Sequence, residues 1–178
     1  MRTRRSPTPR EEGMANIVAA TLEILDTTPP QDVTIRQVAE KSGHHHRLIV
    51  EWFGGKHELF AVAFETIFRG LIESGELFDS GVASRAAVKK GFLLFNYGQM
   101  HDPEFTRRAQ TGFVLGQMEE QIARQRNLSL DEARIAARQL AVHTVARSLF
   151  ATFFGLSDDD LTRIEAWELT HLFEVRQQ

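Results

Sequence analysis

The sequence contains no cysteine, which excludes disulfide bonds, thiolate metal sites and cysteine nucleophiles. It also lacks any apolar run approaching the roughly 20 residues that a membrane-spanning helix needs. The first ten residues are basic but contain no apolar segment like that of a secretory signal. We therefore expect a cytoplasmic protein that forms one domain with a sizeable core, or a small module fused to a larger one.

A strong excess of one charge is missing as well, because the formal net charge is only −3. The first ten residues hold arginines at positions 2, 4, 5 and 10 and no acid, but acidic and basic residues cancel over residues 1–60. The overall charge gives no support for nucleic-acid binding, which would need a local basic patch. The N-terminal arginines would form either an arm along DNA or a tail without a specific role.

Strand alternation, hairpin signals, internal repeats and low-complexity tracts are absent, and almost every segment has helical periodicity. The pattern predicts an all-α fold of about nine helices. We expect helices at about 14–25, 34–41, 45–52, 56–78, 85–100, 103–126 (broken near Gly112 or Gly116), 129–154 and 158–175. Residues 78–85 are expected to form a loop, and residues 85–100 a central buried helix, since they are apolar nearly all round.

Local signals mark several of the helix starts. Thr34 is followed three residues later by Gln37, and Ser129 by Glu132, and both pairs fit the capping box. The pair Asp102-Pro103 supplies a cap and a proline suited to the first helical position.

Two short predicted helices flank a turn that contains Gly43. This is the helix-turn-helix arrangement, whose second helix enters the DNA major groove. Ala39 is small where the two helices would cross, and Ile49 would fill the space between them. Any hairpin of two helices could share these features, so the turn alone does not establish DNA binding.

A wider pattern runs from Ile17 to Phe60. It consists of the amphipathic first helix, Thr34-Ile35-Arg36-Gln37-Val38-Ala39, Ser42-Gly43 and Phe53-Gly54-Gly55-Lys56-His57-Glu58-Leu59. This pattern resembles the N-terminal domain of the tetracycline-repressor (TetR) family of transcriptional regulators. The remaining residues match only in being helical and of the right length. The resemblance implies a helix-turn-helix DNA-binding domain in residues 1–55 and an effector-binding and dimerisation domain in residues 56–178.

The function implied by the resemblance is that of a ligand-responsive transcriptional regulator, a repressor that binds a near-palindromic operator as a dimer. A small-molecule effector would release it from DNA. Two departures weaken the match, because Val50 replaces the usual tyrosine and Arg47 stands where a small residue is common. The alternative is a helical sensor or interaction module of the same fold that lacks specific DNA binding.

The same frame predicts which residues contact double-stranded DNA: Thr34, Arg36, His45, His46, Arg47, Leu48, Trp52 and Lys56. Arg47 would bond guanine O6 and N7 together, or contact only phosphate. Thr34 and Lys56 lie at helix starts, where backbone N–H groups favour phosphate, and the alternative role of Thr34 is that of a helix cap alone. Leu48 and Trp52 have packing as their alternative role, and Arg36 has a surface position.

Three adjacent histidines, His44 to His46, precede or open the second of these helices. They do not suit one metal ion, because successive side chains on a helix point about 100° apart. His57-Glu58 lacks a second histidine at position 61, so we predict no metal and no cofactor. His46 and His45 would instead contact DNA, with binding that strengthens towards about pH 6.5, or they would lie in a solvated turn.

The C-terminal part would hold the effector and the dimer interface. We predict that a small apolar effector contacts Phe92, Phe95, Asn96, Gln99, Met100, Phe113 and Gln117; ordinary core is the alternative for each. Homodimerisation would use the last two helices through Leu140, Leu149, Phe150, Phe153, Phe154, Leu161, Ile164, Ala166, Leu169, Leu172, Phe173 and Val175.

An enzyme is the main rival class, and the sequence argues against it. Asp158-Asp159-Asp160 could suggest a metal site, but their position at a helix start explains them through the helix dipole. His101, His143 and His171 have no serine or carboxylate partner at a telling spacing. We therefore predict no catalytic residues.

Overall fold

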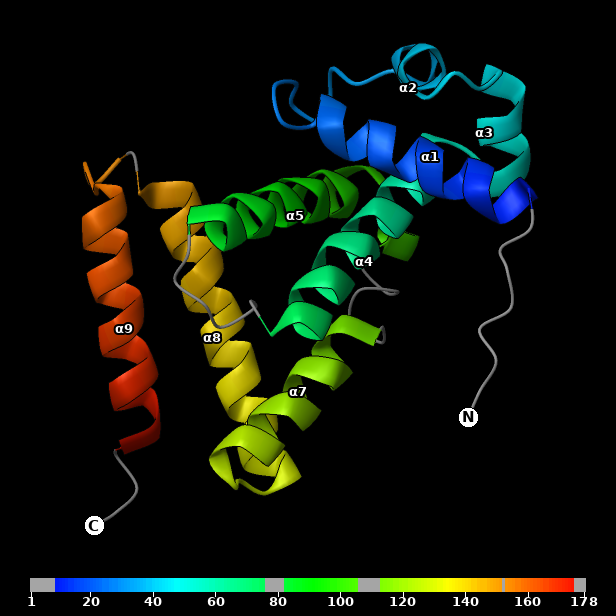
Figure 1. The fold of residues 1–178 in the computed structure, drawn as a ribbon. Coiled ribbons are helices and arrows are strands. Elements are labelled where there is room, and N and C mark those ends of the chain that lie inside the picture. The colour runs from blue at the N-terminus through cyan, green and yellow to red at the C-terminus, as the bar shows by residue number, and fades with distance from the viewer. Residues whose placement is uncertain (1–8, 76–81, 106–112, 152, 175–178) are drawn as a thin grey trace. The chain divides into compact units, whose positions relative to one another are not determined.

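The computed structural model describes residues 9–75, 82–105, 113–151 and 153–174, and within these ranges it contains helices and no strand. The helices are α1 (Pro9–Ile24), α2 (Ile35–Ser42), α3 (His46–Phe53), α4 (Lys56–Ser74), α5 (Val82–His101), α7 (Phe113–Arg126), α8 (Leu130–Phe150) and α9 (Asp158–Glu174) (Figure 1). Residues 103–105 are helical too. The all-α prediction is confirmed. No helix in these ranges is both long and apolar enough to cross a bilayer.

The chain divides into two compact units. The first contains the residues up to Phe64 together with Leu93–Phe105, and the second contains Glu65–Phe92 together with the residues from Thr106 onward. Helices α4 and α5 contribute to both units. The predicted boundary between residues 55 and 56 assigns all of α4 to the C-terminal domain, and it stays a prediction.

The core of the first unit is built where α1, α2 and α3 meet. Ile17, Val38 and Ile49, one from each helix, are almost completely buried. Thr21 is buried as well, and its hydroxyl donates to the Ile17 carbonyl at 2.8 Å, so this polar side chain costs little inside the core. The three helices therefore support one another through a shared apolar centre.

A second cluster of the first unit joins the start of α4 to the end of α5. Phe64 lies against Phe95 and Phe105, with ring centroids 5.9 and 5.7 Å apart. Asp102 caps the turn that follows α5, because its carboxylate accepts from the backbone N–H of Glu104 at 3.0 Å. The predicted cap at Asp102 is confirmed.

In the second unit, α7 and α8 form an antiparallel hairpin. Met118 and Ile122 of α7 and Ala133 and Ala137 of α8 are buried, and small alanines allow the two helices to approach closely. The capping box at Ser129 begins α8, as predicted. Helix α9 lies beside α8 in Figure 1 and is linked to it by ion pairs.

Three expectations about helix extent and burial are wrong. Residues 82–85 belong to α5 and not to a loop, because no helix breaker separates them and Arg85 is held by Glu165. Helix α5 is not buried all round, since Asn96, Gln99 and Met100 are exposed. Helix α8 ends at Phe150 and not at Phe154. The chain forms a turn between the helix end and Gly155, whose φ of 65° lies in the left-handed region.

Candidate nucleic-acid interface

Helix α2 begins with the capping box that the sequence predicts. The Thr34 hydroxyl accepts from the Gln37 backbone N–H at 3.2 Å, and the Gln37 side chain accepts from the Thr34 N–H at 2.7 Å. Two backbone donors that a helix start leaves free are thereby satisfied. The Thr34 side chain has the capping role that was the alternative to a phosphate contact.

The turn after α2 depends on Gly43, whose φ of 70° lies in the left-handed region. The backbone N–H of the next residue, His44, reaches back to the Ala39 carbonyl at 3.1 Å and closes the helix end. The His44 ring is fixed too, with Nδ1 2.8 Å from the Ser42 carbonyl. Because a carbonyl only accepts, His44 donates from Nδ1 in this contact.

His45 is the N-cap of α3. The sequence pattern predicts that the helix begins at about this residue. Its Nδ1 accepts from the Arg47 backbone N–H at 3.2 Å, and its ψ of 137° is extended. An imidazole that accepts at Nδ1 is neutral and carries its proton on Nε2. His45 therefore presents an N–H donor outward while it caps the helix.

Helix α3 has two distinct faces. Ile49 and Phe53 are buried and hold the helix against its neighbours, while Leu48 is half-buried. The outward face carries His46, Arg47, Val50 and Glu51, which are all exposed. The sequence correctly anticipated an outward-facing segment braced by Ile49.

Trp52 anchors α3 to α1. A Cβ atom placed on Gly13 of α1 would lie only 2.7 Å from Trp52 Cζ3 and 3.1 Å from His44 Nε2. The His44 and Trp52 rings also meet edge to face, with their centroids 6.1 Å apart. The indole therefore has a packing role, and glycine at position 13 makes room for it.

Lys56 begins α4, but its ammonium group is held inside the first unit. Nζ donates to the Gln31 carbonyl at 3.2 Å and lies 4.9 Å from the ring centroid of Tyr97 and 5.3 Å from that of Phe60. These contacts are of cation–π type. A phosphate contact by Lys56 would come from its backbone N–H or from a rearranged side chain.

The structure thus places His46 and Arg47 together on one exposed helix face. The His45 cap lies beside them, with the centroid of its ring 4.3 Å from that of His46. Arg36 is exposed on α2. Sequence reasoning missed Val50 and Glu51 as members of the face, although they follow His46 and Arg47 at i+4 spacing. Glu51 adds an acidic group that would oppose nonspecific attraction to phosphate.

The seven residues predicted to contact an effector have separate surroundings. Phe95 packs against Phe64 and Phe105, whereas Phe92 packs against Phe68 at 5.6 Å in the second unit. Asn96, Gln99 and Met100 are exposed, Gln117 is half-buried and the Phe113 side chain lies outside the described residues. A cavity of about 300 Å³ in the second unit has none of these seven among its described lining residues.

Within the described residues, no three histidine or acidic side chains are grouped so that they could hold a metal ion. Asp158 and Asp160 instead stand in the first turn of α9, where Ser157 and Asp160 cap one another. The Ser157 hydroxyl and backbone N–H, which donate to the Asp160 carboxylate, hold its pKa below the ordinary 3.8. This is the structural arrangement that the sequence pattern favoured.

No protein-family model matches the chain, and no curated protein matches it by sequence. Solved structures that share its fold include two regulators. A candidate transcriptional regulator from Pseudomonas aeruginosa PAO1 is 16% identical, with a TM-score of 0.57 and coverage of 94% of this chain and 93% of that one. The TetR family repressor AlkX from a Dietzia strain, implicated in biodegradation of n-alkanes, is also 16% identical, with a TM-score of 0.53 and coverage of 93% and 95%. The chain therefore has the all-helical fold of the TetR regulators.

Proposed function

We propose that the chain is a DNA-binding transcriptional regulator, a repressor that acts as a homodimer in the cytoplasm. The observation that carries the proposal is the exposed face of α3, which is capped by His45, preceded by the Gly43 turn and braced from behind by Ile49. A short helix held in this way can enter the major groove without losing its own support. The likeness in fold to transcriptional regulators supports the same function.

The chemistry of the outward face suits reading of base edges. The Arg47 guanidinium can bond guanine O6 and N7 together, and the exposed Val50 methyl groups suit the thymine C5-methyl group. Glu51 can accept from cytosine N4. Val50, which stands where the TetR pattern has a tyrosine, would thus make a base contact.

A second copy of the chain would cover an apolar surface on α8, the turn after it and α9. Phe150, Phe153 and Phe154 are 51, 81 and 65% exposed, and Trp167 on α9 is 60% exposed. Leu140, which was also expected at the interface, is buried within the unit. Two-fold pairing through α8 and α9 would place two recognition helices about 34–36 Å apart, as a near-palindromic operator requires.

A small-molecule effector would control DNA binding by population shift. It can do so only if it binds the DNA-released conformation more tightly than the DNA-bound one. A repressor of this kind would leave its operator when the effector accumulates.

Selection of bound sequences from a random DNA pool tests the proposal. We expect one preferred near-palindrome, with an affinity that falls steeply with salt. Arg47→Ala should weaken the selected site by about 1–3 kcal/mol, while Arg124→Ala, which removes an exposed arginine of α7, should leave it unchanged. A chain that binds no DNA at low salt would instead be the sensor or interaction module of the same fold.

A further inference from the structure

The cavity of about 300 Å³ lies entirely within the second unit, between α5, α8, the turn after α8 and α9. Its charged lining consists of Arg85 and Lys89 from α5, Arg147 from α8, and Asp158 and Glu165 from α9. Such a volume is at the lower end of the range for small-molecule sites. The charges come from three helices, of which α5 is far from α8 and α9 in the sequence, so the fold itself assembles the site.

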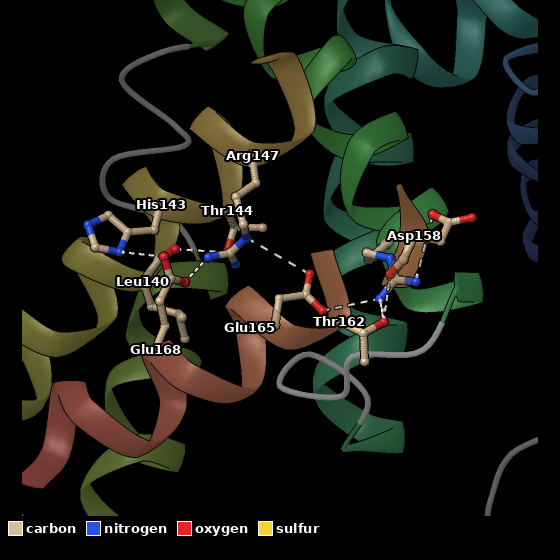
Figure 2. Close-up of polar contacts among 9 residues, drawn as sticks. Leu140, His143, Thr144, Arg147, Asp158, Thr162, Glu165 and Glu168 are labelled. Carbon is tan, nitrogen blue, oxygen red and sulfur yellow. Dashed lines mark hydrogen bonds and ion pairs between the residues drawn. The ribbon is translucent and has the colours of Figure 1, made fainter. Parts of the chain in front are cut away.

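A largely buried ion-pair network forms one wall of the cavity. Glu165 lies 3.3 Å from Arg85 Nη1 and 3.9 Å from Arg147 Nε, so one carboxylate is shared by two guanidinium groups. Arg147 is also paired with Glu168, and Figure 2 shows it directed towards Glu165 and Glu168 of α9. Thr144 accepts from Arg147 Nη2 at 3.1 Å. These contacts fix the wall in one arrangement.

Arg147 stands largely out of water. Its side chain is 12% exposed, and that of Glu165 is 13% exposed. Burial lowers the pKa of Arg147, and the negative charge of Glu165 works against this effect. A desolvated cation interacts more strongly with a further anion than an exposed one does.

Positive charge exceeds negative charge along the lining. Three cationic side chains face two carboxylates, and Glu165 is already shared by Arg85 and Arg147. Asp158 is 72% exposed and lies 3.8 Å from Arg85, so water screens most of its charge. Among the described residues Lys89 has no carboxylate partner. Because Glu168 also pairs with Arg147 from outside the lining, the positive charge left for an anionic ligand among the described residues is that of Lys89.

Apart from Thr144, the rest of the described lining is apolar. Ala86, Ala151, Leu156 and Leu161 border the same space. A ligand that fills it needs an apolar body as well as an anionic head, because a bare inorganic ion would leave the apolar wall in contact with water. A cationic ligand would place a like charge beside Lys89 and the two arginines.

We propose that this cavity binds a small organic carboxylate. The carboxylate head group would lie at Lys89, beside Arg85 and Arg147, and the apolar body would pack against Leu156 and Leu161. The site differs from the aromatic set expected from the sequence. Binding itself does not depend on the proposed function, but the regulatory role of the site rests on it. In that role the carboxylate would be the effector.

Calorimetric titration of the full chain at pH 7.5 tests the site with hexanoate and benzoate as probes. Hexanamide and benzylamine serve as neutral and cationic counterparts, and inorganic phosphate serves as an anion without an apolar body. We expect measurable binding of a carboxylate probe, at least about tenfold weaker binding of the amide, and no binding of the amine. Equal binding of carboxylate and amide, tighter binding of phosphate, or no carboxylate binding would overturn the proposal.

Two variants locate the site without disturbing the buried network. Lys89→Gln should weaken carboxylate binding about tenfold, since it removes one charge-assisted hydrogen bond. Ala86→Trp, at an exposed lining position, should block the space and abolish binding. Lys90→Gln, one residue further along α5 and outside the described lining, removes the same charge and should have no effect. Unaltered affinity in both Lys89→Gln and Ala86→Trp, with native helical content by circular dichroism, would place the site elsewhere.

Measurement of DNA binding separates this proposal from the proposed function. If the chain binds DNA and a carboxylate weakens that binding in the wild type but not in Lys89→Gln, the cavity is the effector site. If carboxylates bind while DNA affinity stays constant, the regulatory role is overturned and the binding site stands. If the chain binds no DNA, the proposed function fails, and the titration still decides the site.

Discussion

Replacement of Gly13 by alanine should separate close helix packing from ordinary helix propensity. Gly13 is a buried residue of α1, and a Cβ atom there would lie 2.7 and 2.8 Å from two carbon atoms of the Trp52 ring. Real Cβ atoms do not approach ring atoms so closely, so the indole, and with it α3, would have to move. Forced repacking of this kind costs about 1–3 kcal/mol.

The change from glycine to alanine also has a favourable part. Inside a helix, alanine is more stable than glycine by about 1 kcal/mol. The expected net effect of Gly13→Ala is therefore a loss of up to about 2 kcal/mol in the free energy of unfolding. DNA affinity should fall as well, because Trp52 sets the position of the recognition helix.

Urea unfolding followed by circular dichroism measures the effect, and two comparisons isolate its cause. In a Trp52→Leu background the smaller side chain should relieve the clash, so that the same glycine replacement gains stability and the double-mutant cycle gives a coupling of about 1–3 kcal/mol. Gly70→Ala, at an exposed position of α4 where an added Cβ meets no atom within 4 Å, should gain up to about 1 kcal/mol. If Gly13→Ala stabilises the wild type as much as Gly70→Ala does, the packing argument is refuted.

Three further outcomes are expected. Thr34→Ala should lower the free energy of unfolding by about 1 kcal/mol, because it removes the cap of α2. Thr34→Ser keeps a capping hydroxyl and should change this free energy little. If urea unfolding shows the same loss of stability in both variants, the capping role is contradicted. The low pKa of Asp160 makes its contribution to stability present above its ordinary pKa of 3.8 and lost as the pH falls through the lower folded value. The thermal-unfolding advantage of the wild type over Ser157→Ala should accordingly be present at pH 6 and shrink below about pH 4; an advantage independent of pH would count against it. Phe153→Asp should yield monomers by light scattering if a second copy covers the exposed ring, and an unchanged mass would exclude that residue from the interface.

The start and end of α2 and the start of α8 were predictable because their signals are local. The boxes at Thr34 and Ser129 and the turn at Gly43 involve residues at most a few positions apart, and their hydrogen bonds are present as expected. The same reasoning placed the helix after Gly43 one residue early. A histidine side chain can accept from a backbone N–H as a serine side chain does. Histidine is not among the residues that are strongly preferred at the N-cap, so the sequence did not mark His45 as the cap.

Contacts between distant segments were not predictable from one sequence. Arg85 and Glu165 are 80 positions apart, so neither helical periodicity nor a short motif connects them. Periodicity also misjudged α5, because an apolar residue such as Met100 faces solvent in the chain while Ser84 is buried. The residues predicted to contact an effector were chosen for their aromatic character, because the sequence does not show which helices pack together.

The construction of α3 has a practical consequence for altering what the protein reads. The cap at His45 and the buried Ile49 and Phe53 stabilise the helix from its end and its back, so the outward positions 46, 47, 50 and 51 contribute little to folding. A library randomised at these four positions should consist mostly of folded members. New binding preferences could then be selected, or could evolve, without prior compensation elsewhere in the chain.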